Sequence, residues 1–344
     1  MTVPSRRHVL VALLASPALA ARARGAAAVT DAAGRAVAVP ERVARVFPAG
    51  PPAAILLCTL APDLLLGWPR ANRPEERAYL LPEVGARPEL GRLTGRGGTA
   101  NLEAVLALRP DVIVDVGSTD ATYVSLADRV QAQTGIPYAL LDGRLDRAAD
   151  TYRTLGRLVR QEARAAELAA YSEDLLARVR ERVAGVPEGQ RPRTYYARGP
   201  RGLETGLGGS INVESIELMG ARNVAGERRG GLATVSLEQV LAWDPEVIVT
   251  IDQDFARLVR SDPSWAGVSA VRAGRVHLSP KLPFGWVDFP PSVNRLAGLP
   301  WLGRVLYPDL FREDLVQHTR DFYTRFYHLT PTDEQIAQVL AGRG

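Results

Sequence analysis

The sequence predicts an α/β protein made of two similar lobes that are joined by a long helical linker. The stretch "TANLEAVLALRPDVIVDVG", which begins at Thr99, returns as "TVSLEQVLAWDPEVIVTID" at Thr234, an offset of 135 residues. Each copy reads as a short amphipathic helix that leads into an apolar strand, which is half of a βαβ unit. Between the copies, residues 146–183 hold no proline and only one glycine, Gly156. That composition favours a helix along the whole segment.

Length and composition agree with this division. The 344 residues are too many for one comfortable core and suit two domains. The chain is 46% hydrophobic and 23% charged, as in ordinary soluble proteins. The predicted domains are an export signal (1–28), an N-terminal lobe (29–145), a helical linker (146–186) and a C-terminal lobe with terminal helices (187–344).

The net charge of +4 arises from the first 28 residues, which hold four arginines and no acid. Without them the chain is neutral, so the charge balance does not predict a basic face for nucleic acid. Cys58 is the only cysteine, and the protein must therefore be stable without an internal disulfide.

The N-terminus reads as a cleavable export signal. Its apolar run from Val9 to Ala20 is too short to span a membrane. Arg6-Arg7 resembles a twin-arginine signal, although the positions that follow depart from the usual pattern, and the ordinary export route stays open. Cleavage is expected after Ala20 or Ala28. The segment has no cysteine, so we expect a periplasmic protein without a lipid anchor.

The strands and helix of the N-terminal lobe follow from local signals. The segment "RVARVFPAG" (42–50) reads as a strand that runs into a Pro-Gly loop. Asn101 caps the helix of the first copy, Glu103 lies in its first turn, and Pro110 ends it. The following "DVIVDVG" is an apolar run typical of a strand that is buried on both faces, and "IPYALLD" (136–142) is a further strand.

The C-terminal lobe repeats this order. "RPRTYYARG" (191–199) corresponds to the first strand of the other lobe. Ser236 caps the second helix, Pro245 ends it, and "EVIVTID" is the buried strand. "GRVHLSP" (274–280) is a later strand of the same sheet.

These segments resemble the periplasmic solute-binding proteins of the iron-siderophore, haem and cobalamin class, which serve ABC importers. The resemblance rests on the two repeated motifs, on the opening "TDAAGRAVAVPERVARVFPAGP" and on "INVESIELMGARNVA". It implies two lobes bridged by a stiff helix, with the ligand held in a cleft between them. It also implies a monomer without enzymatic activity or cofactor, whose partner is a permease in the inner membrane.

The resemblance further implies one docking glutamate on each lobe. Glu214 stands at the position expected in the C-terminal lobe. In the N-terminal lobe the expected glutamate is replaced by Ala54. Docking would then use another acid, such as Asp63, or be weaker on that side.

Ligands of open α/β sheets lie beyond the carboxyl ends of the strands, so the loops that follow strands supply the candidate contacts. An anionic ligand would be held from opposite lobes by Arg96, in the glycine-rich loop 91–101, and by Arg198. The loop 280–302 resembles one that borders the ligand in members that bind molybdate or tungstate, and it offers an aromatic contact. The complete set of candidate contacts is Arg96, Ser118, Tyr123, Tyr196, Arg198, Arg201, Asp252 and Trp286.

The protein is not expected to ligate a metal itself. His277, His318 and His328 are the histidines beyond the signal, and no HExxH-like spacing or Cys cluster accompanies them. A metal would arrive within a chelator or with oxo ligands.

The favoured function is therefore capture of an iron chelate, a ferric siderophore, for an ABC importer. Molybdate or tungstate, haem and cobalamin are alternative ligands for the same fold. A sensor outside transport and an exported α/β enzyme are the rivals from other classes. The enzyme is disfavoured because the chain lacks a GxGxxG after the first strand, a GxSxG elbow, a P-loop and an HExxH.

Overall fold

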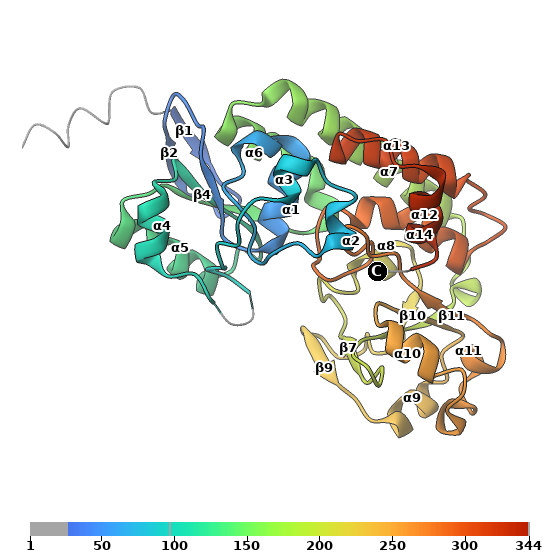
Figure 1. Cartoon of the computed structure of the whole chain (residues 1–344). Coiled ribbons are helices and arrows are strands. Elements are labelled where there is room, and N and C mark those ends of the chain that lie inside the picture. Colours follow the sequence, from blue (N-terminus) through green and yellow to red (C-terminus); the bar gives the residue numbers. More distant parts are fainter. Residues whose placement is uncertain (1–26, 96–97, 343–344) are drawn as a thin grey trace, which may run out of the picture.

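The computed structural model describes residues 27–95 and 98–342 and confirms the two-lobe α/β architecture (Figure 1). Residues 1–26 of the predicted export signal lie outside the described residues, and so does Arg96. None of the helices in the described ranges is long and apolar enough to cross a membrane.

The N-terminal lobe is built on a parallel sheet with the strand order β3-β4-β5. An antiparallel pair, β1 and β2, precedes this sheet in the chain. The strands are β1 (Ala27–Thr30), β2 (Ala36–Val39), β3 (Val46–Pro48), β4 (Val112–Gly117) and β5 (Tyr138–Asp142). The helices are α1 (Pro51–Leu60), α2 (Pro74–Arg77), α3 (Pro82–Gly85), α4 (Leu102–Leu108) and α5 (Ala121–Thr134), with 3-10 turns at Pro62–Leu64 and Leu145–Arg147.

The C-terminal lobe has a parallel sheet of order β11-β10-β6-β8 and a separate antiparallel pair, β7-β9. The strands are β6 (Arg193–Ala197), β7 (Glu204–Gly206), β8 (Arg222–Asn223), β9 (Leu232–Thr234), β10 (Val247–Thr250) and β11 (Val276–Leu278). The helices are α8 (Glu214–Leu218), α9 (Leu237–Trp243), α10 (Gln253–Leu258) and α11 (Ser269–Arg272), with 3-10 turns at Glu188–Gln190 and Pro263–Trp265.

The sequence repeat is a structural repeat. Helix α4 leads into β4 as α9 leads into β10. The side chain of Asn101 accepts a hydrogen bond from the amide of Glu103, and that of Ser236 accepts one from Gln239. Both helices end in a left-handed residue at the same repeat position, Arg109 with φ 46° and Asp244 with φ 40°. The predicted caps and strands are thus confirmed in both copies.

The prediction of one continuous linker helix is wrong. The segment divides into α6 (Ala148–Val159) and α7 (Glu162–Ala184), and Arg160 between them has φ 59°. The two helices approach so closely that a Cβ at Gly156 would lie 2.4 Å from the Cβ of Ala165. The break therefore follows from the packing of α6 against α7. Helix propensity, which is all that the composition of the segment indicates, could not predict it.

Both sheets turn one face toward a common hydrophobic core. Val112 and Val114 of β4, and Val247 and Val249 of β10, belong to the same buried cluster. The alternate residues Ile113 and Ile248 face away into smaller cores, one in each lobe. This alternation follows from the period of two along a strand.

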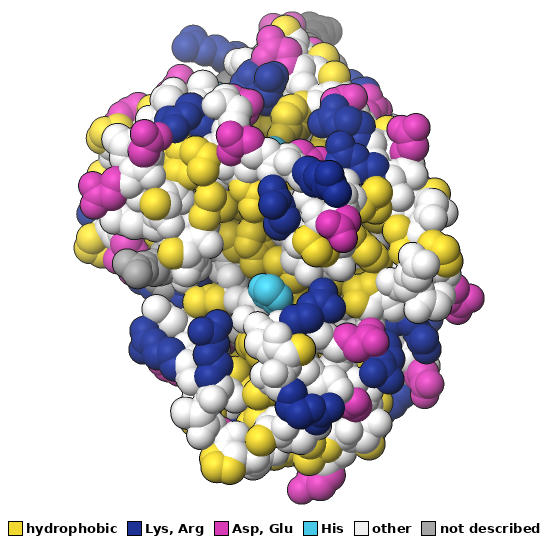
Figure 2. Space-filling model, turned by 90° about the vertical axis from the view of Figure 1, so that its right-hand side faces the viewer, with side chains coloured by type: hydrophobic (Ala, Val, Ile, Leu, Met, Phe, Trp, Pro, Cys, Tyr) yellow, Lys and Arg dark blue, Asp and Glu magenta, His cyan; other side chains and the backbone are white. Residues whose placement is uncertain are grey.

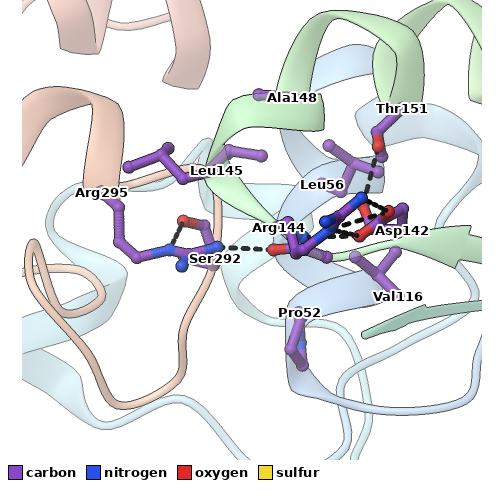
Figure 3. A pocket seen from close by; sticks show the side chains of 12 residues that line it. Pro52, Leu56, Val116, Asp142, Arg144, Leu145, Ala148, Thr151, Ser292 and Arg295 are labelled. Carbon is purple, nitrogen blue, oxygen red and sulfur yellow. Dashed lines mark hydrogen bonds and ion pairs between the residues drawn. The ribbon is translucent and has the colours of Figure 1, made fainter. Parts of the chain in front are cut away.

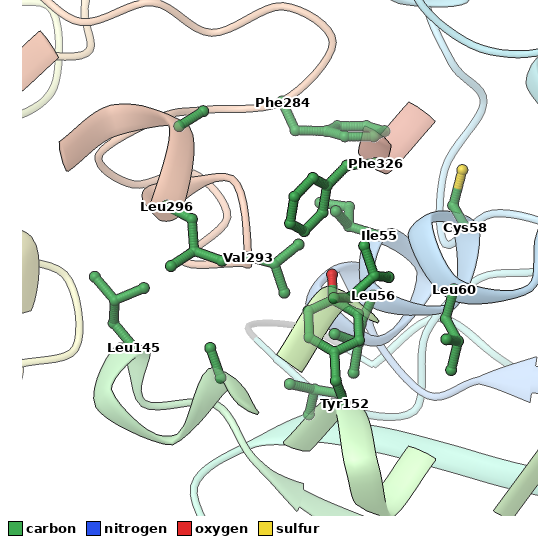
Figure 4. Packing of buried hydrophobic residues seen from close by; sticks show 14 of the residues in the cluster. Ile55, Leu56, Cys58, Leu60, Leu145, Tyr152, Phe284, Val293, Leu296 and Phe326 are labelled. Atoms are coloured by element: carbon green, nitrogen blue, oxygen red, sulfur yellow. The ribbon is translucent and has the colours of Figure 1, made fainter. Parts of the chain in front are cut away.

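The common core is completed by the C-terminal helices α12 (Arg295–Leu306), α13 (Leu315–Tyr327) and α14 (Asp333–Leu340). Figure 4 shows Leu56 of α1 and Tyr152 of α6 beside Phe284, Val293 and Phe326 from the C-terminal part of the chain. Because the two lobes share this apolar core, separating them exposes buried surface, and wide hinge motion is disfavoured.

Candidate ligand-binding site

A small cavity, about 20 Å³ in volume, lies between the lobes (Figure 3). Pro52, Val116 and Asp142 line it from the carboxyl ends of the N-terminal strands, and Ser292 and Arg295 line it from the other side. A water molecule needs about 10–15 Å³ by this kind of measure, so the cavity has room for little more than one water. It occupies the position at which ligands bind in open α/β sheets.

The carboxyl ends of β4 and β5 meet at two glycines. The amide of Gly143 donates to the carbonyl of Gly117 at 2.8 Å, and a Cβ at residue 143 would lie 2.7 Å from the Cα of Gly117. Such an approach requires glycine at position 143. It leaves the carbonyl of Gly143 turned toward the C-terminal part of the chain, where it accepts a hydrogen bond from Arg295 Nη2 at 2.5 Å.

Arg295 is a buried cation between the lobes. It begins α12, and only 1% of its surface is exposed. Its Nη1 donates to Glu214 Oε2 at 2.6 Å, and its Nε donates to the carbonyl of Ser292 at 3.1 Å. Together with the bond to Gly143, these contacts tie three separate segments to one guanidinium.

Glu214 contacts both lobes. Its two carboxylate oxygens accept hydrogen bonds from the amide of Leu145 at 3.0 and 2.9 Å, in addition to the ion pair with Arg295. The side chain is 20% exposed. The carboxylate that was predicted to dock a transporter is thus engaged inside the molecule. Ala54, at the other predicted docking position, is fully buried, whereas Asp63 is exposed.

Arg144 is a second cation at the cavity, and the candidate contacts drawn from the sequence omitted it. Its Nε lies 3.1 and 3.3 Å from the carboxylate oxygens of Asp142, and its Nη2 lies 3.0 Å from Oδ2 (Figure 3). Its side chain is 54% exposed. The signal that could have identified it is its place directly after the strand "IPYALLD".

The charges of the two arginines at the cavity are balanced, because Asp142 pairs with Arg144 and Glu214 pairs with Arg295.

The polar residues near the carboxyl end of β6 form an ion-pair network around Arg198, whose predicted role as a ligand contact stays a prediction. Arg198 is 9% exposed and forms ion pairs with Glu204 at 3.1 Å and with Asp288 at 3.3 Å. Fully buried Tyr196 donates to Asp288 Oδ2 at 2.7 Å, and burial raises its pKa well above the ordinary value. Two carboxylates thus lie within ion-pairing distance of one guanidinium, while Nε and Nη1 of Arg198 have no hydrogen-bond partner among the described residues.

The aromatic contact predicted in the loop 280–302 is also misplaced. Trp286 is fully buried in the common core, and a Cβ at Gly298 would lie 2.1 Å from its carbonyl oxygen. It is therefore a packing residue. The aromatic side chain that this loop exposes is Phe289, 69% exposed, whose φ of 67° turns it outward.

The other predicted contacts are not brought together. The hydroxyl of Ser118 donates to Asp120 Oδ2 at 2.8 Å, and Tyr123 packs against the outer core of its lobe. Arg201 is exposed, and Asp252 caps α10 by accepting from two of its amides. Arg96 lies outside the described residues, and Thr94, two positions before it, donates to buried Asp115 at 2.9 Å. Burial raises the pKa of Asp115.

On the face shown in Figure 2, basic and acidic side chains are interspersed around a hollow with a hydrophobic floor. This face has no continuous basic surface of the kind that binds nucleic acid.

The histidines are separate from one another and from the cavity. His318 Nε2 lies 3.2 Å from the carbonyl of Ala297, and His328 Nε2 lies 3.1 Å from that of Thr59. In residues 27–95 and 98–342 no group of three or more His, Cys, Asp or Glu side chains is placed to hold a metal ion. Burial lowers the pKa of His277, His318 and His328 below the ordinary value of 6.5.

These histidines predict that the protein loses stability in mild acid. Their pKa values are lower in the folded state, so the unfolded chain takes up protons first as the pH falls below about 6.5. The free energy of unfolding should therefore be highest above pH 6.5 and decrease toward pH 5.5. Urea unfolding across this range measures the slope, and His277→Gln should make it shallower. A wild-type protein that gained stability on acidification would contradict the prediction.

The chain was compared with known proteins. Residues 56–282 match the model of a family described as periplasmic binding protein. The molybdate-binding protein MolA of Haemophilus influenzae is 27% identical over 280 residues, which cover 74% of this chain and 78% of MolA.

Solved structures share the fold. An ABC transporter solute-binding protein from Sulfurospirillum deleyianum superposes with a TM-score of 0.83 at 28% identity, over 91% of this chain and 98% of that one. MolA of Haemophilus influenzae bound to molybdate superposes with a TM-score of 0.74 at 24% identity, over 89% of this chain and 99% of that one.

Proposed function

The chain belongs to the periplasmic binding protein family, and on that premise we propose that it captures a small tetrahedral oxyanion of the molybdate or tungstate type between its lobes for an ABC importer. The observation that carries the proposal is the cavity between the lobes, which is small and lined by two arginines, Arg144 and Arg295.

The size of the cavity favours a compact ligand. A volume of about 20 Å³ has to expand before any anion enters, and a small oxyanion requires the least expansion. A ferric siderophore is too large for this cavity, because drug-sized ligands occupy pockets of roughly 300–1,000 Å³. A second hollow, of about 350 Å³, lies beside Asp142, Arg144 and Arg147. The ferric siderophore favoured by the sequence therefore becomes the second ligand to test.

The chemistry of the cavity favours the same class. A guanidinium presents a planar fork of donors that matches the oxygens of an oxyanion. The hydroxyl of buried Ser292 is a further polar group close to Arg295. The relationship to MolA, a molybdate-binding protein, adds independent support. The ligand brings its own oxo groups, so the protein needs no cofactor or metal-ligating cluster of its own, and it acts as a binding protein without catalysis.

The remaining expectations complete the proposal. The protein works as a monomer in the periplasm, which it reaches by the signal within residues 1–28. The signal is then removed, and the twin-arginine route is the favoured one.

Binding depends on Arg144. Calorimetric titration with molybdate, tungstate and a ferric catecholate siderophore should show binding of the two oxyanions. Arg144→Ala should weaken oxyanion binding roughly tenfold to a hundredfold, because a hydrogen bond to a charged group contributes on the order of 1.5–3 kcal/mol. Arg129→Ala, an exposed arginine on α5 that lines neither pocket, is the matched control and should bind like the wild type. Binding of the siderophore alone would refute the oxyanion proposal.

Docking onto the importer uses Glu103 and Glu238. These glutamates occupy the same position in the two copies of the repeat, one on each lobe, and both are exposed. One turn later each helix exposes a leucine, Leu106 at 43% and Leu241 at 37%. The repeat thus supplies the acidic position on each lobe that a transporter with docking arginines requires.

Replacing both glutamates by arginine should abolish uptake of the oxyanion while the purified protein binds it normally. Like charges would then oppose each other across the docking surface. Uptake of labelled molybdate by cells that carry the protein and its importer measures the effect. Glu181→Arg, an exposed glutamate on α7, is the control. Normal uptake by the double variant would exclude these docking positions.

A further inference from the structure

The structure assigns Glu214 the role of an internal competitor that occupies the anion site of Arg295 until the ligand displaces it. This inference rests on the proposed oxyanion function. It starts from the balance of charge at the cavity, where each arginine already has a carboxylate partner. An anion that entered beside both carboxylates would meet no net positive charge. Withdrawal of Glu214 leaves a net positive charge at the cavity, because Arg144 and Asp142 still balance while Arg295 is unpaired.

The contacts of Glu214 are those that an oxyanion would make. Its carboxylate accepts from Arg295 Nη1 at 2.6 Å and from the amide of Leu145 at 2.9 and 3.0 Å. A carboxylate and a tetrahedral oxyanion both carry negatively charged oxygens that accept hydrogen bonds from a guanidinium. The side chain is thus a chemical mimic of the ligand, held by donors from two lobes.

Of the two partners, Glu214 is the one free to leave. Its side chain is 20% exposed, whereas that of Arg295 is 2% exposed and is also bonded to the carbonyls of Gly143, Ser292 and Ile211. A carboxylate that swings toward solvent is rehydrated, and the guanidinium stays fixed. The carboxylate contacts two residues that line the cavity, Arg295 and Leu145, so its departure frees donors on both of them.

Replacement of the Glu214 carboxylate by the oxyanion ligand changes which group joins the two lobes. In the empty protein Glu214 joins Arg295 to Leu145. In the occupied protein the ligand takes over this position and is reached by Arg144 from the other side. The lobes are held by an ionic contact in both states, and the ligand must displace the internal carboxylate to bind. The protein therefore binds the ligand less tightly than it would if the donors of Arg295 and Leu145 were free.

Glu214→Gln tests the inference with molybdate as the probe. The amide keeps the size of the side chain and removes the competing charge. We expect molybdate to bind about tenfold more tightly, which is within the usual range of coupling between two sites, and the empty protein to unfold at lower urea. Glu214→Asp keeps the charge but shortens the reach, so it should give a smaller gain in affinity in a protein closer to wild-type stability. Glu217→Gln, on the same helix α8, is the control and should leave the affinity unchanged.

The outcomes separate the inference from the proposed function. If wild-type protein binds molybdate and both Glu214 variants bind it no more tightly, Glu214 is a structural tie and the inference is overturned, while the proposed function stands. If Glu214→Gln is too unstable to titrate, the Glu214→Asp result alone decides in the same way. If neither the wild type nor any variant binds molybdate or tungstate, the proposed function and the inference both fail.

Discussion

The arrangement of the two lobes depends on one buried guanidinium, that of Arg295. It reaches from the start of α12 to the carbonyl of Gly143 at the end of β5 and to the carboxylate of Glu214 at the start of α8. A buried charge is tolerated only where partners replace the water it has lost, and removal of one partner of a buried pair destabilises a protein by roughly 3–5 kcal/mol. Arg295 meets this requirement with backbone carbonyls and one carboxylate, and these partners come from both lobes. The same group that joins the lobes therefore also lines the cavity between them.

The common apolar core explains why such a site suits a small ligand. The inner faces of both sheets, α1 and the C-terminal helices bury their side chains together, so the lobes resist wide separation (Figure 4). In the proposed function, this narrow cavity selects its ligand first by size and then by charge. Its two arginines pair with Asp142 and Glu214, so the four side chains carry no net charge until one of the carboxylates moves.

Local signals in the sequence were enough to predict the fold. The caps Asn101 and Ser236, and the alternation along β4 and β10, act within a few residues and survive in the structure. The site was predicted less well, because its decisive contacts join residues far apart in the chain. Arg198 forms an ion pair with Asp288, ninety positions away, and the linker breaks where Gly156 meets Ala165. In the loop 280–302 the sequence offered several aromatic residues, and only the backbone decides that Trp286 is buried and Phe289 is exposed.

The most direct test of the account is the position of the bound anion. Crystals grown with tungstate allow the tungsten atom to be located by anomalous scattering, without reference to any assumed site. The account predicts a single strong peak in the interlobe cavity, within hydrogen-bonding reach of the guanidinium groups of Arg295 and Arg144, with the Glu214 side chain turned away. A peak beside Arg198, or a cavity that stays empty at saturating tungstate while Glu214 remains on Arg295, would contradict it.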